Sequence, residues 1–404
     1  MRVAWRTLAL AGAILATSRL AAAQTSMTLA EALARARDQA PRIISARLAI
    51  EEARGRLAGA THGQLNPEVD FGLGNRQEHD TRSTDLDLGF SQAFEPSGRR
   101  SAREAMATAG IEESQAQLED VTRVTLRATA VAFVRALHLA ERIRLLERTS
   151  ELATNILQIA ERRFRAGDIA VLDVNISRAS LARVRAEIQG ATAERAIVVG
   201  ELKELVQVEG DLEIQGDLKS AGDPQLTALL AATANLPEVR SLGAAIRQAE
   251  AEGQFGQSFR RADYGFGVRY QREGGDQIVL GGLTLTLPWS SKGQEPIAVG
   301  LARANRLKAE LNAALVRARI EVQSAFEAYQ RRSAAVGELE RDAFPSLDEN
   351  DALATRSFEV GQLGLVELLL IRREILDTRF QYLDALLEAA LARVEVDARA
   401  GVLR

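Results

Sequence analysis

Two carboxylates stand at matching places in two similar stretches of the chain. The first stretch, residues 162–174, reads RRFRAGDIAVLDV and contains Asp173; the second, residues 356–368, reads RSFEVGQLGLVEL and contains Glu367. The two acids lie 194 positions apart. Carboxylates gathered at one place attract cations and repel anions. A carboxylate here can equally be a solvated side chain or one that favours a helix N-terminus, and the residues leave these interpretations open.

Few other side chains have the types and spacing that chemistry requires. The chain contains no cysteine, which excludes disulfides, thiolate metal sites and a cysteine nucleophile. Its histidines, His62, His79 and His138, lack the spacing of a metal-ligand pair, and there is no P-loop, G-x-S-x-G or H-E-x-x-H motif. We therefore expect no enzyme activity, no cofactor and no bound metal. A net charge of −4 indicates no basic surface for nucleic acid.

The composition favours long helices over a set of compact cores. Only 4% of the 404 residues are aromatic, and Ala, Leu, Arg and Glu dominate. Residues 99–166 contain no proline, and the stretch 293–360 is equally long. A helix of 68 residues would be roughly 100 Å long. Only partners of similar length can bury such helices, so we expect residues 172–206 and 366–400 to pack against them as antiparallel coiled-coil hairpins.

Glycines mark the expected turns of these two hairpins. Gly167 and Gly361 occupy matching places in the two quoted stretches. Glycine tolerates the positive φ that a helix end often needs, and Asp168 can cap the helix that follows. The hairpin tips are therefore predicted near residues 164–173 and 358–367.

The same order of parts in both halves indicates an internal duplication. Pro41 and Pro237, like Pro96 and Pro288, stay between 192 and 196 positions apart. The predicted divisions are a first repeat at 24–210, a linker at 211–235 and a second repeat at 236–404.

Each repeat also contains a predicted β-hairpin, at about 67–95 and 263–288. Alternation places Leu86, Leu88 and Phe90 on one face and acids and glycines on the other. A soluble sheet with one face on a core fits this pattern, and so does a membrane barrel with a wet interior. Four strands cannot close a barrel, so two chains would have to share eight strands or three chains twelve. The pattern does not choose between these numbers.

The first residues have the pattern of a signal peptide, predicted at 1–23. Arg2 and Arg6 precede a mostly apolar run, and three alanines precede Gln24. The run is shorter than the roughly 20 residues that span a bilayer. We expect export and cleavage.

The two tip motifs and the duplication resemble the TolC-like outer-membrane efflux factors, over essentially the whole length after the signal peptide. The stretches NPEVDFGLG and FSQAFEPSGRRSAREAMA look most like the CzcC-like branch, which exports heavy-metal cations. The resemblance implies a mainly α fold with a small β part. Duplicated coiled-coil hairpins would form a tunnel into the periplasm, and four strands per chain would join a trimeric 12-strand barrel in the outer membrane.

The resemblance also implies partners and a function. The partners would be two further copies of the chain, outer-membrane lipid, a periplasmic adaptor and an inner-membrane efflux pump of the RND type. The chain would serve as a passive exit duct for small molecules or metal cations. The alternative is a periplasmic coiled-coil adaptor, which usually has one hairpin flanked by small β domains rather than two duplicated hairpins.

Residue roles carried over from the family concern the tips and the corners. In a trimer, Glu367 and Asp173 would each form a pore ring that selects cations. The other expected roles are adaptor contact for Arg165, Gly167, Gly361 and Leu365, gating for Phe358, Leu363 and Phe164, and strand–helix corners for Pro96 and Pro288.

The second tip departs from the best-known members of the family. Those members carry a tyrosine and an arginine that hold the tunnel shut, where this chain has Phe358 and Leu363. Leu370 also replaces a second acid that some members have. The family's tip lock is therefore not expected in the same form.

Overall fold

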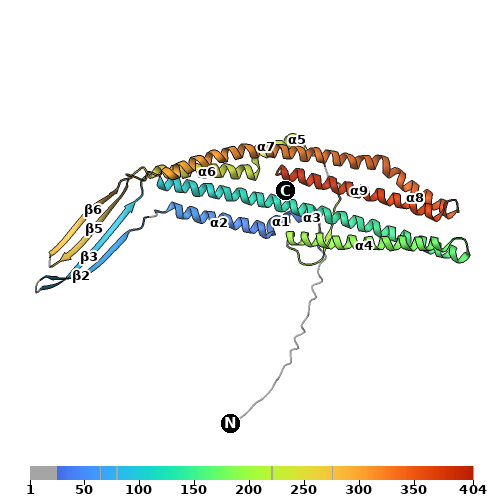
Figure 1. The fold of residues 1–404 in the computed structure, drawn as a ribbon, viewed down its shortest axis with the longest axis horizontal. Coiled ribbons are helices and arrows are strands. Elements are labelled where there is room, and N and C mark those ends of the chain that lie inside the picture. Colours follow the sequence, from blue (N-terminus) through green and yellow to red (C-terminus); the bar gives the residue numbers. More distant parts are fainter. Residues whose placement is uncertain (1–24, 64, 79–80, 220–221, 275, 404) are drawn as a thin grey trace, which may run out of the picture.

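The computed structural model describes residues 25–403 except 64, 79–80, 220–221 and 275. The predicted signal peptide and His79 lie outside the described residues. The described chain forms an elongated arc, with a β-sheet at one end and two helical turns at the other (Figure 1).

Four antiparallel strands form the sheet in the order β2-β3-β5-β6. The strands are β2 (Glu68–Glu78), β3 (Thr81–Phe94), β5 (Asp263–Glu273) and β6 (Asp276–Thr286). Both predicted β-hairpins are thus confirmed. One continuous ladder joins them, because β3 of the first repeat pairs with β5 of the second.

Both faces of this sheet are exposed in the described chain. One face carries apolar side chains such as Val69 and Leu283, which are 74% and 92% exposed. The other carries charged groups, including Arg269, which pairs with Asp87 at 3.3 Å. A soluble sheet would cover its apolar face with a core. The exposed apolar face instead fits the lipid-facing surface of a barrel to which each chain contributes four strands.

In the first repeat one long helix packs against three shorter ones. α3 (Arg99–Ala166) is a single helix over the predicted 68 residues. α2 (Pro41–Thr61), which has proline at its first position as helices often do, packs beside the sheet-proximal half of α3. α4 (Val171–Val206) packs beside the tip half, and α1 (Leu29–Gln39) contacts the middle.

The second repeat has the same plan but its long helix is interrupted. The expected single helix over 293–360 is wrong, because α7 (Gln294–Glu338) passes into a π-helix, η2 (Leu339–Ala343), before α8 (Phe344–Glu359). Pro345 explains the break: proline has no N–H to donate and its ring clashes with the preceding turn, and a π turn accommodates the disturbance. The shorter neighbours are α6 (Pro237–Ser258) and α9 (Leu365–Arg399).

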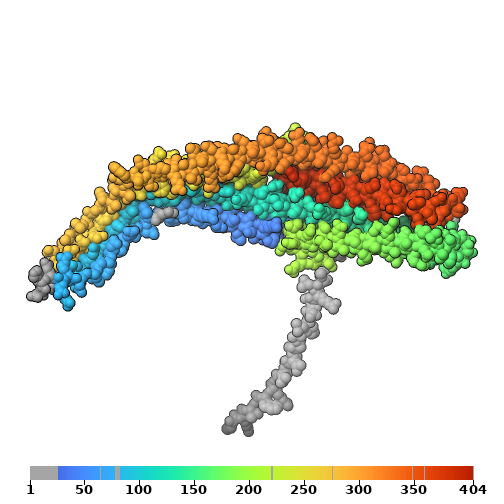
Figure 2. Space-filling model, viewed as in Figure 1, coloured from blue at the N-terminus to red at the C-terminus, as the bar shows by residue number. Residues whose placement is uncertain are grey.

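The two repeats lie side by side along the arc. In Figure 2 the first, blue to green, follows the concave edge, and the second, yellow to red, follows the convex edge. Among the described residues, no helix is both long and apolar enough to cross a membrane.

Narrow seams of small side chains hold the helices together. Buried residues recur every seven positions on α3 and α4, which is the repeat of a coiled coil; they include Ala102, Ala109, Ala116, Leu139, Leu146, Ala153, Ala160, Ser177, Val184, Ala191 and Val198. Where α6 meets α7 the backbones nearly touch, since a Cβ on Gly300 would lie 2.6 Å from the backbone nitrogen of Gly253. The low aromatic content follows from this packing.

The middle of the arc holds the largest apolar core. Leu126 and Phe133 of α3 pack there with residues of α1, α4 and α9. Two short strands that the sequence analysis did not predict, β1 (Thr25–Met27) and β4 (Leu212–Ile214), pair in parallel beside it. The segment after β4 contains α5 (Leu226–Ala232) and a 3-10 turn, η1 (Thr233–Asn235).

Candidate functional site at the paired helical tips

The first hairpin turns at Gly167, whose φ is 85°. The N–H of Asp168 donates to the carbonyl of Arg163 at 2.9 Å, and the N–H of Gly167 donates to the carbonyl of Phe164 at 3.0 Å. These two bonds make a Schellman ending, which needs a residue in the left-handed region. Glycine adopts that region without steric cost.

The second hairpin repeats the same turn at Gly361, whose φ is 78°. The N–H of Gln362 donates to the carbonyl of Ser357 at 2.8 Å, and the N–H of Gly361 donates to the carbonyl of Phe358 at 3.1 Å. Each of these residues lies 194 positions after its counterpart in the first tip. The duplicated sequence motif therefore folds into a duplicated turn.

The two matching acids each stabilise the start of the helix after the turn. Asp173 is the third residue of α4, and its carboxylate accepts a hydrogen bond from the N–H of Ala170 at 3.3 Å. Glu367 is the third residue of α9, and its carboxylate accepts from the N–H of Gly364 at 2.9 Å. An acid here satisfies a backbone donor and favours the positive end of the helix dipole. The helix-terminus role is thus realised, and the pore-ring role stays a prediction.

The two tips enclose one groove that gathers most of the predicted tip residues. This tip groove has a volume of about 640 Å³. It is lined by Ala160, Arg163, Ile169, Asp173, Phe358, Gly361, Leu363, Gly364, Leu365, Val366 and Glu367. The groove therefore has acids from both hairpins, one arginine and an apolar floor.

Phe358 forms the centre of the apolar packing between the hairpins. Its side chain is 4% exposed and packs with Ile156 and Val174 from the first hairpin. The guanidinium of Arg163 lies 4.7 Å from the centre of the Phe358 ring. The Phe358 ring is therefore enclosed within one chain, and its gating role stays a prediction.

The remaining predicted tip residues divide into exposed and buried ones. Phe164 is 44% exposed and Arg165 is also at the surface. Leu363 is half-buried, and Leu365 is only 7% exposed within the same core as Phe358. The Leu365 side chain therefore lies away from the surface position that an adaptor contact requires. The gate and adaptor roles of this set stay predictions.

Arg163 is a tip residue that was not predicted from the sequence. Its guanidinium lines the tip groove and also donates to the carbonyl of Phe358 at 3.4 Å. The available signal was a break in the repeat, because the position matching Arg163 in the second motif is Ser357.

At the other end, the predicted corner prolines separate strands from long helices. Pro96 lies between β3 and α3, and Pro288 between β6 and α7. The first corner also carries an unpredicted ion pair in which Arg103 binds both carboxylate oxygens of Glu95, at 2.6 and 2.8 Å. Only 11% and 13% of these two side chains is exposed, so the pair anchors the end of the sheet to α3.

The two histidines that the structure describes, His62 and His138, lie in different parts of the fold. His62 follows the end of α2, and His138 is buried on α3 with its Nε2 3.0 Å from a carboxylate oxygen of Asp384. Burial lowers the pKa of His138, although Asp384 opposes the shift. Within the residues that the structure describes, no group of three or more histidine and acidic side chains is arranged to hold a metal ion.

Both the family match and the similar relative relate this chain to outer-membrane efflux and metal-resistance proteins. Residues 32–206 match the family described as "Outer membrane efflux protein". The cobalt-zinc-cadmium resistance protein CzcC of Cupriavidus metallidurans is 24% identical over 315 residues, which cover 75% of this chain and 74% of that protein.

Solved outer-membrane channels share the fold over nearly the whole chain. The Campylobacter jejuni CmeC channel has a TM-score of 0.77 at 15% identity and covers 93% of this chain and 85% of its own. VceC of Vibrio cholerae has a TM-score of 0.75 at 17% identity, with 92% and 96% covered. With its duplicated tips and exposed four-stranded sheet, the chain is thus similar in sequence and in fold to outer-membrane efflux proteins.

Proposed function

We propose that this protein is the outer-membrane exit channel of a tripartite efflux system. Its two ends carry the proposal. At one end an exposed apolar sheet suits outer-membrane lipid; at the other, paired tips enclose a groove with apolar and charged walls. An elongated arc of helices joins the two ends (Figure 1).

The strands of one chain cannot close a barrel, so the protein needs partners. Four strands leave two open edges, which lipid cannot satisfy, so further copies must complete the barrel. Three copies would give twelve strands and six tips. The tips would meet a periplasmic adaptor that connects the channel to an inner-membrane pump of the RND type. Energy and cargo selection would come from that pump, and this chain would act passively.

The sheet at one end and the duplicated hairpins at the other both argue against the alternative function, a periplasmic adaptor. An adaptor needs no lipid-facing sheet, whereas Phe71 and Leu285 on the apolar face are 64% and 61% exposed. The duplicated hairpins also exceed the single hairpin usual in adaptors.

For cargo we propose divalent metal cations. The supporting observations are the similarity to a cobalt-zinc-cadmium resistance protein and the pair of acids, Asp173 and Glu367, that line the tip groove. A duct needs an electrostatic preference for such cations rather than a binding site, because tight binding would slow passage.

The test compares a deletion strain with strains that express the chain or a tip variant. After loading with Zn²⁺, Co²⁺ or Cd²⁺, cell-associated metal should be higher without the chain and return to normal when it is restored. Val360→Asp places a charge on an exposed tip residue and should abolish the recovery while the assembled trimer remains.

Two further readouts separate the possible failures. Pore conductance of the purified protein in planar bilayers tests the channel itself. A conducting trimer whose absence leaves metal content unchanged would refute the cargo. A protein that forms no pores would refute the channel.

A further inference from the structure

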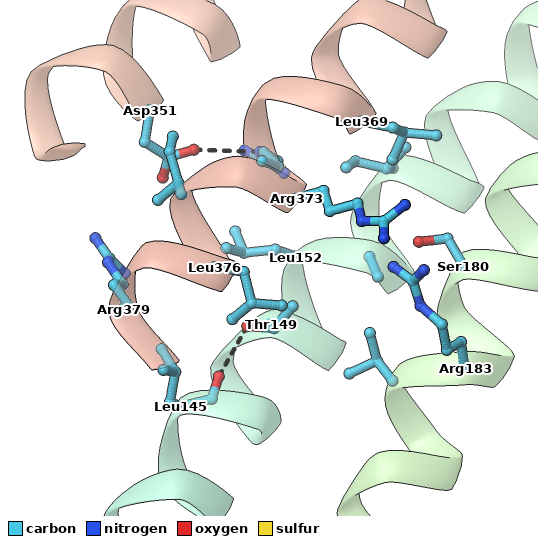
Figure 3. Close-up of a pocket in the computed structure, with 15 residues that line it drawn as sticks. Leu145, Thr149, Leu152, Ser180, Arg183, Asp351, Leu369, Arg373, Leu376 and Arg379 are labelled. Atoms are coloured by element: carbon cyan, nitrogen blue, oxygen red, sulfur yellow. Dashed lines mark hydrogen bonds and ion pairs between the residues drawn. The ribbon is translucent and has the colours of Figure 1, made fainter. Parts of the chain in front are cut away.

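A second, smaller cavity lies between the hairpins and shares no lining residue with the tip groove. Its volume is about 80 Å³, and its walls come from α3, α4, α8 and α9 (Figure 3). Both hairpins contribute, so a ligand there would contact the two repeats at once.

The floor of the cavity is apolar. Ile156 of α3, Val184 of α4 and Ile375 of α9 each expose less than a tenth of their surface, and Ala153 lies among them. Carbon atoms placed on this floor would leave water, which is favourable in proportion to the apolar area removed from water.

The mouth of the cavity is basic. Arg183 of α4 and Arg373 of α9 direct their guanidinium groups toward the same space, beside the hydroxyl of Ser180 (Figure 3). Four arginines and one acid line the cavity, in a protein whose net charge is −4. The two arginines belong to different hairpins, and their like charges repel each other.

Among the described residues, Arg183 and Arg373 form only long ion pairs with acids on their own helices, so their guanidinium groups can still bind an anion. Arg183 lies 3.8 Å from Glu187 and Arg373 lies 3.6 Å from Asp377, both along their own helices. These separations exceed the roughly 2.7–2.9 Å of a charge-assisted hydrogen bond. Arg372 differs, because its guanidinium is held by the Asp351 carboxylate at 3.3 Å and the Thr355 hydroxyl at 3.0 Å.

We propose that this cavity binds a small amphipathic carboxylate, of which benzoate is the simplest aromatic example. One edge of its ring would lie on the apolar floor, and the rest of the molecule would extend through the open mouth, with its carboxylate between Arg183 and Arg373. Arginine presents paired N–H donors that match a carboxylate. The bound anion would also remove the repulsion between the two arginines and thereby join the first hairpin to the second.

The experiment measures benzoate binding to the assembled trimer in detergent by isothermal titration calorimetry. Benzamide, which has the same ring without the charge, is the ligand control. Arg183→Gln and Arg373→Gln should each raise the Kd for benzoate at least tenfold. Arg185→Gln, at an exposed arginine on the same helix that does not line the cavity, should leave the Kd unchanged.

A second variant tests the space rather than the charge. Ser180→Leu fills the mouth while keeping both arginines, and it should also weaken binding at least tenfold. Absence of benzoate binding to the wild-type trimer would overturn the proposal. So would equal affinity for benzamide, or benzoate binding that survives both arginine substitutions. Because the readout is binding, its failure would leave the channel function untouched.

Discussion

The guanidinium of Arg163 lies over the ring of Phe358, 4.7 Å from its centre. One residue belongs to the first tip and the other to the second, so this contact joins the ends of the two hairpins. The contact is asymmetric. The position matching Phe358 in the first repeat is Phe164, which is exposed, and the position matching Arg163 in the second is Ser357.

A double-mutant cycle on this pair should reveal coupling between the tips. A cation–π contact at a partly exposed site contributes about 0.5–1 kcal/mol. Arg163→Met and Phe358→Leu should therefore each speed hydrogen exchange of the tip amides, and the double variant should lose less than the sum. Strict additivity of the two opening free energies would show that the contact contributes nothing.

Charge and helix capping at Glu367 can be separated by two substitutions. Glu367→Gln keeps an acceptor for the Gly364 N–H, because glutamine serves at this position of a capping box, but it removes the negative charge. Cation selectivity should fall in Glu367→Gln, as judged from reversal potentials in a salt gradient across a planar bilayer.

Glu367→Ala provides the comparison, since it removes both the charge and the hydrogen bond. It should lower selectivity to the same extent and also destabilise the start of α9 by about 0.5–1 kcal/mol. Reversal potentials that match the wild type in both variants would assign Glu367 to capping alone.

The glycine of the second tip should be irreplaceable for geometric reasons. Gly361 has φ 78° and open space around its Cα, so a valine there meets backbone strain rather than a clash. The cost is about 1–2 kcal/mol for a left-handed residue. Gly361→Val should therefore reduce metal export without reducing the amount of assembled trimer.

Gly337 provides the control position, because it is a glycine that needs no positive φ. It lies inside α7 without a positive φ and also has open space, so Gly337→Ala should be neutral or stabilise the helix by about 0.5–1 kcal/mol. Loss of trimer in Gly361→Val, measured by blue native electrophoresis, would assign the glycine a folding role instead.

Buried His138 should make the helical part sensitive to mild acid. Burial lowers its pKa in the folded protein, with Asp384 and Glu194 opposing and Arg142 supporting the shift. As the pH falls, His138 therefore binds a proton at a higher pH in the unfolded chain than in the folded protein. The contribution to stability is therefore complete above about pH 6.5 and is lost as pH falls from there toward the folded pKa.

Melting temperatures of the trimer at pH 7.5 and 5.5 test this linkage. The wild type should melt lower at pH 5.5, and His138→Gln should reduce the difference. His62→Gln, at the end of α2, should retain it. An equal pH dependence in all three proteins would show that His138 does not control it.

Periodicity and spacing predicted most of the architecture. The absence of proline from residues 99–166 and the glycine at each tip are local features of the sequence, so the helices and turns could be inferred. The break before Pro345 was missed although this proline lies inside the stretch predicted as one helix, because a proline can also kink a helix without ending it. The pairing of β1 with β4 was missed because three-residue strands carry no detectable alternation.

The tip site could be located from the sequence but not resolved into roles. Asp173 and Glu367 were recognisable by their matching places, and their capping bonds required the backbone. The burial of Phe358 and Leu365 arises from packing between segments almost 200 residues apart, on which the sequence pattern is silent. Arg163 was detectable only as a departure from the repeat, and its contact with Phe358 could not be predicted because the two residues belong to different hairpins.

Several copies of this chain should share one barrel in the outer membrane. The most direct measurement is native mass spectrometry of the complex extracted with detergent from isolated outer membranes. A complex of three chains in that fraction is the predicted result, with twelve strands at one end and six tips at the other. A single chain recovered from the soluble periplasmic fraction would show that the strands do not form a shared barrel.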